Sequence, residues 1–307
     1  MRHGHSSGLT QDLPPVRSAL FVPAHREDYL AKADARGADA VILDLEDSVA
    51  EAARDRAVEA ASRWIANRSD PHSPVVVVRI NPLSKGRMRS EIMQLVSPNL
   101  TAVQIPKVDS PQDIRTVSEF LGYAEGVRGL EYGLTRIWPL IESATAVQRS
   151  AKLARSSTRI AFMGGGAADG GDLAASVGFR WTASMQETHP LRAKVLLAAR
   201  AAGVQNPMSG IFVDIDDLDG LQRFALQNRD LGYEGMMVIH PSHVDVVNRV
   251  FGPTDNELKE AEEILAALES AARRGDGAAI VRGKMVDEAH AKAARLLLAR
   301  AGRPVDE

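Results

Sequence analysis

The chain has 307 residues, of which 45% are hydrophobic, and its formal net charge is −3. This length suits one large core or an α/β barrel with an appended segment, and the charge balance argues against a nucleic-acid partner, which normally requires a basic excess. The sequence has no cysteine, which excludes disulfides, thiolate metal sites and cysteine nucleophiles and predicts a reducing, cytoplasmic location.

The first sixteen residues are polar and end in Pro14, Pro15 and Val16. They contain neither the apolar core of a signal peptide nor a run of about 20 apolar residues that could span a membrane. We therefore predict a disordered segment over residues 1–16 and expect no membrane partner.

Short runs with high β propensity recur along the chain, and several are almost continuously apolar, as in strands buried on both faces of a parallel sheet. The runs are Ser18–Ala24, Ala40–Glu46, Val75–Asn81, Ala102–Val108, Arg136–Ser143, Arg159–Gly164, Gly210–Asp214 and Gly235–His240. Eight such strands alternating with helices predict an α/β fold, a (β/α)₈ TIM barrel, with a doubly wound open sheet as the alternative.

Helical patterns fill the intervals between these runs. Val58, Ala61 and Ile65 share one face of a predicted helix. Ser110 followed by Pro111 places a favourable N-cap before a proline at the first helical position, which indicates where another helix begins.

The pattern changes after the eighth strand. Phe251–Pro253 interrupts the chain, and Thr254 with Glu257 forms the sequence signature of a capping box before a new apolar helical stripe. We therefore predict a catalytic barrel domain over residues 17–252 and a C-terminal helical lid or oligomerisation segment over residues 253–307.

Polar and charged residues follow most of the predicted strands. Active sites of (β/α)₈ barrels lie at the carboxyl ends of the strands, so these side chains are expected to meet at one mouth. They are Asp44, Glu46, Asp47, Arg79, Lys107, Glu142, Asp169, Asp172 and His240. The acids favour a hard cation with oxygen ligands; Mg²⁺ typically takes one or two carboxylates. Among the others, Asp44 and Glu46 are predicted catalytic residues, and Lys107 and His240 predicted substrate ligands.

Two further segments and one histidine suggest known binding motifs but do not match them. The glycine-rich loop Gly164–Asp172 lacks the Lys-Ser/Thr pair of a P-loop. The acidic run Asp214–Gly220 fails the ligand register of a Ca²⁺ loop, and Asp216 is predicted to be a helix N-cap. For His243, a surface histidine on a helix is favoured over a second metal ligand.

The chain resembles the family of citrate lyase beta subunits, malyl-CoA and citramalyl-CoA lyases and, more distantly, the pyruvate-dependent HpcH/HpaI class II aldolases. Any one matching segment is weak evidence, but their order over residues 17 to about 300 is highly specific. The segments are Arg17–Pro23, Ala40–Val49, Val78–Asn81, Ile105–Lys107, Pro139–Glu142, Asp172–Gly178, Leu231–Gly235, Ile239–Pro241 and Gly283–Asp287.

The resemblance implies specific roles for several residues. It implies that Glu142 and Asp172 bind Mg²⁺, with Mn²⁺ as the alternative ion and Asp169 as the alternative to Asp172. It implies that Arg79 binds the keto-acid part of the substrate. It also implies that Asp287 reaches a neighbouring subunit's active site as an acid/base group in a homotrimer or hexamer.

The implied activity is that of a carbon–carbon lyase. The substrate is expected to be a 3-hydroxyacyl thioester such as malyl-, citramalyl- or citryl-CoA, cleaved to a 2-keto acid and an acyl thioester. Two alternatives stay open, namely a pyruvate-class aldolase acting on hydroxy-keto acids and a carrier-dependent subunit of a larger lyase complex. Departures from the family pattern, such as Ala24 in place of glycine, leave the keto acid and the acyl group undetermined.

Overall fold

A computed structural model describes residues 13–70, 72–165 and 167–303. The chain divides between Asn248 and Arg249 into two compact units. The first unit contains eight parallel strands. They are β1 (Ser18–Pro23), β2 (Ala40–Asp44), β3 (Val75–Arg79), β4 (Ala102–Ile105), β5 (Arg136–Pro139), β6 (Phe162–Gly164), β7 (Asn206–Ser209) and β8 (Gly235–Val238).

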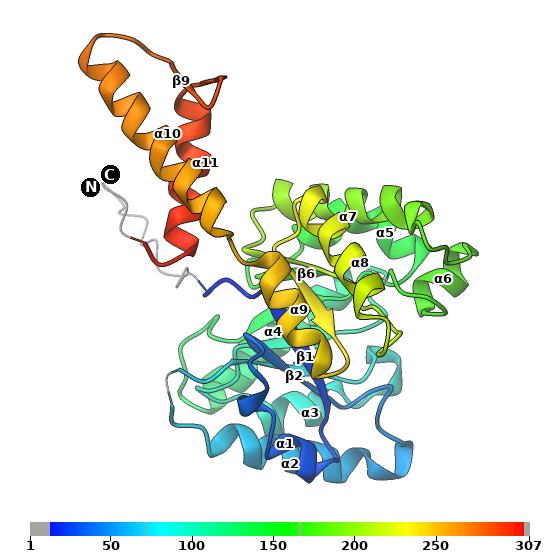
Figure 1. Cartoon of the computed structure of the whole chain (residues 1–307). Helices are drawn as coiled ribbons and strands as arrows, with labels where there is room; N and C mark the ends of the chain where they lie inside the picture. Colours follow the sequence, from blue (N-terminus) through cyan, green and yellow to red (C-terminus); the bar gives the residue numbers. More distant parts are fainter. Residues whose placement is uncertain (1–12, 71, 166, 304–307) are drawn as a thin grey trace. The chain divides into compact units, whose positions relative to one another are not determined.

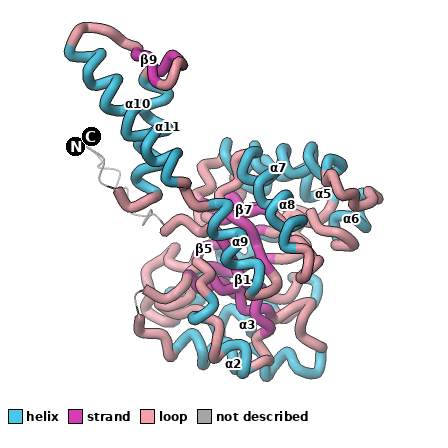
Figure 2. The backbone as a smooth tube through the Cα atoms, viewed as in Figure 1, coloured by secondary structure: helices cyan, strands magenta, loops and turns pink. Residues whose placement is uncertain are grey.

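The strands form an almost closed ring, so the predicted (β/α)₈ barrel is confirmed. Strand β1 pairs in parallel with both β2 and β8, which brings the first and last strands of the unit together. Two isolated parallel bridges, Ile137 to Ile160 and Leu140 to Gly164, connect the β5 and β6 sides of the ring. Figure 2 shows the strands in magenta at the centre of this unit with cyan helices around them.

Helices follow the strands, as the chain-coloured view shows (Figure 1). The predicted stripe Val58, Ala61 and Ile65 is the buried face of α2, and Ser110 caps α4 with Pro111 at its first position. The helices of this part are α1 (Glu27–Leu30), α2 (Arg54–Ala66), α3 (Met88–Leu95), α4 (Pro111–Val127), α5 (Ala144–Ala154), α6 (Asp172–Val177), α7 (His189–Ala201), α8 (Leu218–Leu231) and α9 (Ser242–Phe251). Among the residues described, no helix is long and apolar enough to cross a bilayer.

The barrel interior is packed with side chains from alternate strand positions, as expected for this fold. Trp138 of β5 stacks on Phe162 of β6 with ring centroids 5.0 Å apart, and both are fully buried. Smaller residues such as Ala40 and Ala102 complete the same cluster. The interior is therefore a solid core, and the open space lies above it at the carboxyl ends of the strands.

Three sequence predictions about this unit are wrong in detail. The seventh strand is Asn206–Ser209, and the more apolar run Gly210–Asp214 lies in the loop after it. Strand β7 contains a proline, but its backbone carbonyl still accepts from Glu234, so the ladder is maintained on that side. Asp217, not Asp216, caps α8, and His243 is fully buried instead of on the surface.

The second unit contains α10 (Asp255–Arg273), the antiparallel hairpin of β9 (Ala279–Val281) and β10 (Lys284–Val286), and α11 (Glu288–Arg300). The capping box of Thr254 and Glu257 is present at the start of α10. Leu258 and Ala261 of α10 pack with Ala294 and Leu298 of α11 in a small core separate from the barrel interior. The hairpin was not predicted, because its strands are only three residues long.

The predicted segments were 1–16, 17–252 and 253–307, and the two observed units meet between Asn248 and Arg249. Residues 1–12 lie outside the described residues. Val16 is fully buried, and its amide donates to the Asn206 side chain at 3.1 Å, so the packed barrel begins before residue 17. At the other end, the division between the units falls inside α9, a few residues before the Phe251–Pro253 interruption.

Candidate active site

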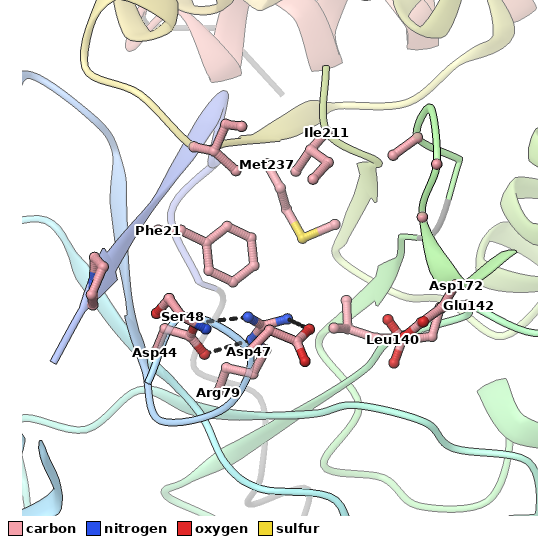
Figure 3. A pocket seen from close by; sticks show the side chains of 15 residues that line it. Phe21, Asp44, Asp47, Ser48, Arg79, Leu140, Glu142, Asp172, Ile211 and Met237 are labelled. Atoms are coloured by element: carbon pink, nitrogen blue, oxygen red, sulfur yellow. Dashed lines mark hydrogen bonds and ion pairs between the residues drawn. The ribbon is translucent and has the colours of Figure 1, made fainter. Parts of the chain in front are cut away.

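A cavity of about 600 Å³ lies at the carboxyl ends of the barrel strands. Figure 3 shows that charged side chains form one part of its wall and apolar side chains another. The lining residues are Phe21, Pro23, Asp44, Asp47, Ser48, Arg79, Leu140, Glu142, Ala168, Gly170, Gly171, Asp172, Ile211, Met237 and Ile239. The ends of seven strands, or the loops after them, contribute to this list, and this is the end of the barrel where the sequence predicted the site.

Arg79 and Asp44 form the most buried ion pair of the cavity wall. The two residues are register partners at the ends of β3 and β2, so their side chains point to the same face. Arg79 donates from Nε and Nη2 to the two Asp44 carboxylate oxygens, each at 2.7 Å. Burial opposes both charges, but the pair more than compensates: the pKa of Asp44 is lowered and the pKa of Arg79 is raised.

Glu46, Asp47 and Lys107 extend this ion pair into a network. The Arg79 Nη1 atom lies 3.0 Å from Glu46 and 3.2 Å from Asp47, and Lys107 Nζ lies 2.7 Å from Glu46. Burial raises the pKa of Glu46 despite these cations. Burial alone would lower the pKa of Lys107, but its contact with Glu46 raises it, so both cations stay charged.

Glu142 and Asp172 face the cavity from the loop after β5 and the first residue of α6. Glu142 Oε1 accepts a hydrogen bond from the Lys107 backbone amide at 2.5 Å, and Asp172 lies 3.6 Å from Lys107 Nζ. Burial, together with repulsion from Glu46 and Asp172, raises the pKa of Glu142 to about 7. These two carboxylates concentrate negative charge at this side of the cavity.

The donor set fits a hard divalent cation. Glu142 and Asp172 offer carboxylate oxygens, and a cation held by them would favour the charged form of Glu142, which burial and then repulsion disfavour. Within the described ranges, no group of three His, Cys, Asp or Glu side chains forms a complete metal cage. Two carboxylates with room for water and substrate is the arrangement typical of Mg²⁺.

The other predicted site residues lie elsewhere. Asp169 lines a separate cavity of about 230 Å³ with Trp181 and Phe212. His240 is exposed, and its Nδ1 lies 2.7 Å from Ser242 Oγ, beside the cavity-lining Ile239. The structure thus groups Arg79, Asp44, Glu46, Lys107, Glu142 and Asp172 at one mouth but does not bring Asp169 or His240 to its wall.

Asp287 belongs to the second unit and caps α11. Its carboxylate accepts from the backbone amides of Ala289 and His290 and lies 2.7 Å from the His290 ring. The His290 contact lowers the pKa of Asp287, so the group is a carboxylate at neutral pH. Its part in catalysis stays a prediction.

Sequence reasoning missed the apolar wall of the cavity. Phe21, Ile211 and Met237 line it, and the Phe21 ring lies 4.9 Å below the Arg79 guanidinium in a cation–π contact. Phe21 is near the end of a strand, which was the available signal. Apolar residues on strands buried on both faces do not reveal which side faces the site.

Comparison with known proteins gives consistent matches over almost the whole chain. A (3S)-malyl-CoA thioesterase of Cereibacter sphaeroides is 31% identical over 289 residues, which cover 94% of this chain and 95% of that protein. An L-malyl-CoA/beta-methylmalyl-CoA lyase of the same species is 33% identical over 311 residues, with the same shares covered.

Among solved structures, the CitE protein of Mycobacterium tuberculosis in complex with magnesium, acetoacetate and coenzyme A matches with a TM-score of 0.72 and 29% identity. The match covers 94% of this chain and 98% of that one. The family model for HpcH/HpaI aldolase/citrate lyase matches residues 17–241, which hold every residue of the cavity wall. The chain therefore belongs to the HpcH/HpaI aldolase/citrate lyase family.

Proposed function

We propose that this protein is a Mg²⁺-dependent carbon–carbon lyase. Its substrate is a 3-hydroxyacyl thioester such as malyl-, citramalyl- or citryl-CoA, which it cleaves to a 2-keto acid and an acyl thioester. The main support is that two cavity-facing carboxylates, Glu142 and Asp172, lie at the same mouth as the partly buried cation Arg79. The malyl-CoA lyase relative and the CitE complex with coenzyme A agree with this substrate class.

Glu142 and Asp172 are the proposed Mg²⁺ ligands. Bound Mg²⁺ supplies a Lewis acid and a template for the carboxylate and hydroxyl oxygens of a substrate. The Lys107 amide donates to the Glu142 carboxylate at 2.5 Å and so helps to hold it in place. Asp169 is the weaker candidate for the second ligand, because it lines the other cavity.

Arg79 is the proposed partner of the substrate carboxylate. Asp44 holds the guanidinium rigidly, so little side-chain entropy remains to be lost when a substrate binds. Lys107 adds a second positive charge near the same mouth and is itself held by Glu46. We assign Asp44 and Glu46 to positioning these cations and to maintaining their charge.

In the proposed reaction the substrate hydroxyl gives its proton to the Asp287 carboxylate, and its oxygen becomes the keto oxygen of the 2-keto acid. The bond between the hydroxyl-bearing carbon and the thioester α-carbon breaks, and its electron pair stays on the thioester as an enolate. Asp287 is the proposed donor of the proton that this α-carbon then takes up. Because the His290 contact lowers the pKa of Asp287, the carboxylate must leave this contact before it takes up the hydroxyl proton that it later returns.

The proposal is tested by incubating the purified full-length protein with Mg²⁺ and each of malyl-, citramalyl- and citryl-CoA. Release of glyoxylate, pyruvate or oxaloacetate together with an acyl-CoA is the expected result, and chelation of Mg²⁺ should stop it. Cleavage of hydroxy-keto acids without a thioester would instead place the protein with the pyruvate-class aldolases. Turnover only after an acyl carrier protein is added would indicate a subunit of a larger lyase.

A second candidate is hydrolysis of the thioester, supported by the similarity to a protein named (3S)-malyl-CoA thioesterase. Hydrolysis of malyl-CoA gives malate and free coenzyme A, whereas cleavage of the carbon–carbon bond gives glyoxylate and acetyl-CoA. Separating these four products in the same assay decides between the two reactions.

A further inference from the structure

The N–H groups of the Arg79 guanidinium differ in how strongly they are engaged by neighbouring carboxylates. A guanidinium can bind a carboxylate through two N–H groups on two edges, the Nε–Nη2 edge and the Nη1–Nη2 edge. Asp44 occupies the first edge with two contacts of 2.7 Å. A substrate carboxylate can therefore be bidentate only at the Nη1–Nη2 edge. Nη1 donates a hydrogen bond to Asp47 at 3.2 Å and also lies 3.0 Å from Glu46, which accepts no hydrogen bond from it.

Asp47 differs from the other two acids around Arg79 in its exposure. Its side chain is 58% exposed, whereas those of Asp44 and Glu46 are 2% and 3% exposed. Asp47 also reaches Lys107 Nζ at 3.6 Å, so it contacts both cations of the mouth. It lies on the loop after β2, and Figure 3 shows its carboxylate beside Arg79 at the cavity wall.

These contacts suit a group that is held in place by charge and not by burial. Moving Asp44 or Glu46 away from Arg79 would leave a buried carboxylate without its partner, which is costly. Moving Asp47 only returns an exposed carboxylate to water, and exposed ion pairs contribute little stability. Of these three acids, Asp47 is therefore the one that an incoming anion can replace.

We propose that Asp47 is a displaceable counter-ion that occupies the carboxylate position on Arg79 until an anionic substrate replaces it. Asp47 thereby sets how tightly the site binds carboxylates and favours ligands that bring their own negative charge to Arg79. This inference rests on the proposed function, because that function assigns Arg79 to the substrate carboxylate. It adds a specificity-determining residue that the metal and substrate assignments do not include.

The test compares pyruvate binding to the full-length wild-type protein and to Asp47→Asn by calorimetry in saturating Mg²⁺. The amide removes the competing charge, while Asp44 and Glu46 still hold Arg79. The dissociation constant for pyruvate should fall about tenfold, which corresponds to about 1.4 kcal/mol. Binding of pyruvamide, which has no carboxylate, should be the same in both proteins, and Asp47→Glu should restore the weaker binding of pyruvate.

Asp55→Asn is the matched control, because it makes the same charge change on α2 at a side chain that is 88% exposed and paired with Arg87. Its dissociation constant for pyruvate should equal that of the wild type. Unchanged or weaker pyruvate binding in Asp47→Asn, an equal gain in Asp55→Asn, or no binding to either protein would each overturn the inference. Failure of the lyase proposal is measured separately, as absence of thioester cleavage by the wild type.

Discussion

Lys107 shows how one residue can organise two parts of the site. Its backbone has φ of 53°, in the left-handed region that a residue with a Cβ atom rarely adopts. The cost of this conformation is about 1–2 kcal/mol. In return, the amide donates to Glu142 while the side chain points to Glu46. A single strained residue therefore joins the proposed metal ligands to the Arg79 network.

The assignment of the metal ligands predicts that Glu142→Gln and Asp172→Asn each abolish Mg²⁺-dependent turnover. Each change removes one ligand charge without opening a cavity in the core, so thermal unfolding should stay close to that of the wild type. Asp169→Asn should be far milder, because Asp169 lines the other cavity. Turnover and Mg²⁺ affinity of the three variants test this, and loss of Mg²⁺ binding in Asp169→Asn alone would reverse the assignment.

At Arg79, replacement by lysine should be damaging although the charge is kept. An ammonium group cannot make the two parallel contacts with Asp44 and also present a second planar edge to a substrate. We expect kcat/KM to fall, and the fall should correspond to a loss of about 2–4 kcal/mol of transition-state stabilisation. Steady-state kinetics of Arg79→Lys provide the measurement, and near-normal values would remove Arg79 from the site.

Among the helices and strands, a buried ion pair joins Glu125 of α4 to Arg159, which lies just before β6. Arg159 donates from Nη1 and Nη2 to the two Glu125 oxygens at 2.8 and 2.7 Å, and Glu125 also accepts from the amides of Gly133 and Thr135. Both side chains are almost completely buried. This pair fixes the connection from α4 to β5 and lies outside the cavity wall.

Glu125→Gln should destabilise the fold strongly, because it leaves the Arg159 charge buried without its partner. The expected loss in the free energy of unfolding is about 3–5 kcal/mol. Glu119→Gln, an exposed position on the same helix, should change it by less than about 0.5 kcal/mol. Urea denaturation at neutral pH measures both variants, and equal effects would contradict the importance of the pair.

The same pair gives a pH dependence of stability. Burial raises the pKa of Glu125, but Arg159 and the two amides lower it more, so it lies below the ordinary value. The unfolded chain then binds the proton first as pH falls. The stabilisation is therefore complete above the unfolded pKa of about 4.3 and is lost as pH falls through the lower folded value. Unfolding of Glu125→Gln should lack this part of the acid dependence.

In the whole molecule, the proposed catalytic residues belong to different units. The barrel unit carries Arg79, Glu142 and Asp172, and the helical unit carries Asp287. We propose that the segment 253–307 acts as a lid that excludes water and completes the site on a neighbouring protomer of a trimer or hexamer. Asp287 is exposed at the cap of α11, so its carboxylate can reach a substrate once it leaves the His290 contact.

This arrangement predicts complementation between inactive variants. Asp287→Ala and Glu142→Gln should each be inactive alone, and a subunit-exchanged mixture should recover part of the activity if lid and metal site come from different chains. Truncation after Pro253 should leave a barrel that binds Mg²⁺ and a keto acid but does not cleave a thioester. No recovery despite proven exchange would count against a shared site, and full activity of the truncated barrel would indicate a pyruvate-class aldolase.

The barrel, its eight strands and the polar residues of its mouth could all be predicted from the amino-acid pattern. Runs such as Val75–Val78 are apolar at every position, which only burial on both faces explains, and parallel strands bring their carboxyl ends to one edge. Seven of the eight strand runs were located in this way. The seventh was not, because β7 is placed by its neighbours, through Asn206 to Ala161 and through its carbonyls to Glu234, and not by its own β propensity.

The contacts between the side chains of the site could not be predicted in this way, because they depend on the folded arrangement of the strands. In the structure, Asp172 lines the same cavity as Glu142, whereas Asp169 lines a different one. The two aspartates are only three positions apart in the chain, so the sequence could not distinguish them. The structure also shows that Arg79 is already paired and that Asp47 is the exposed member of its partners. Distances and burial arise from the register of strands far apart in the chain, and local pattern carries no information about them.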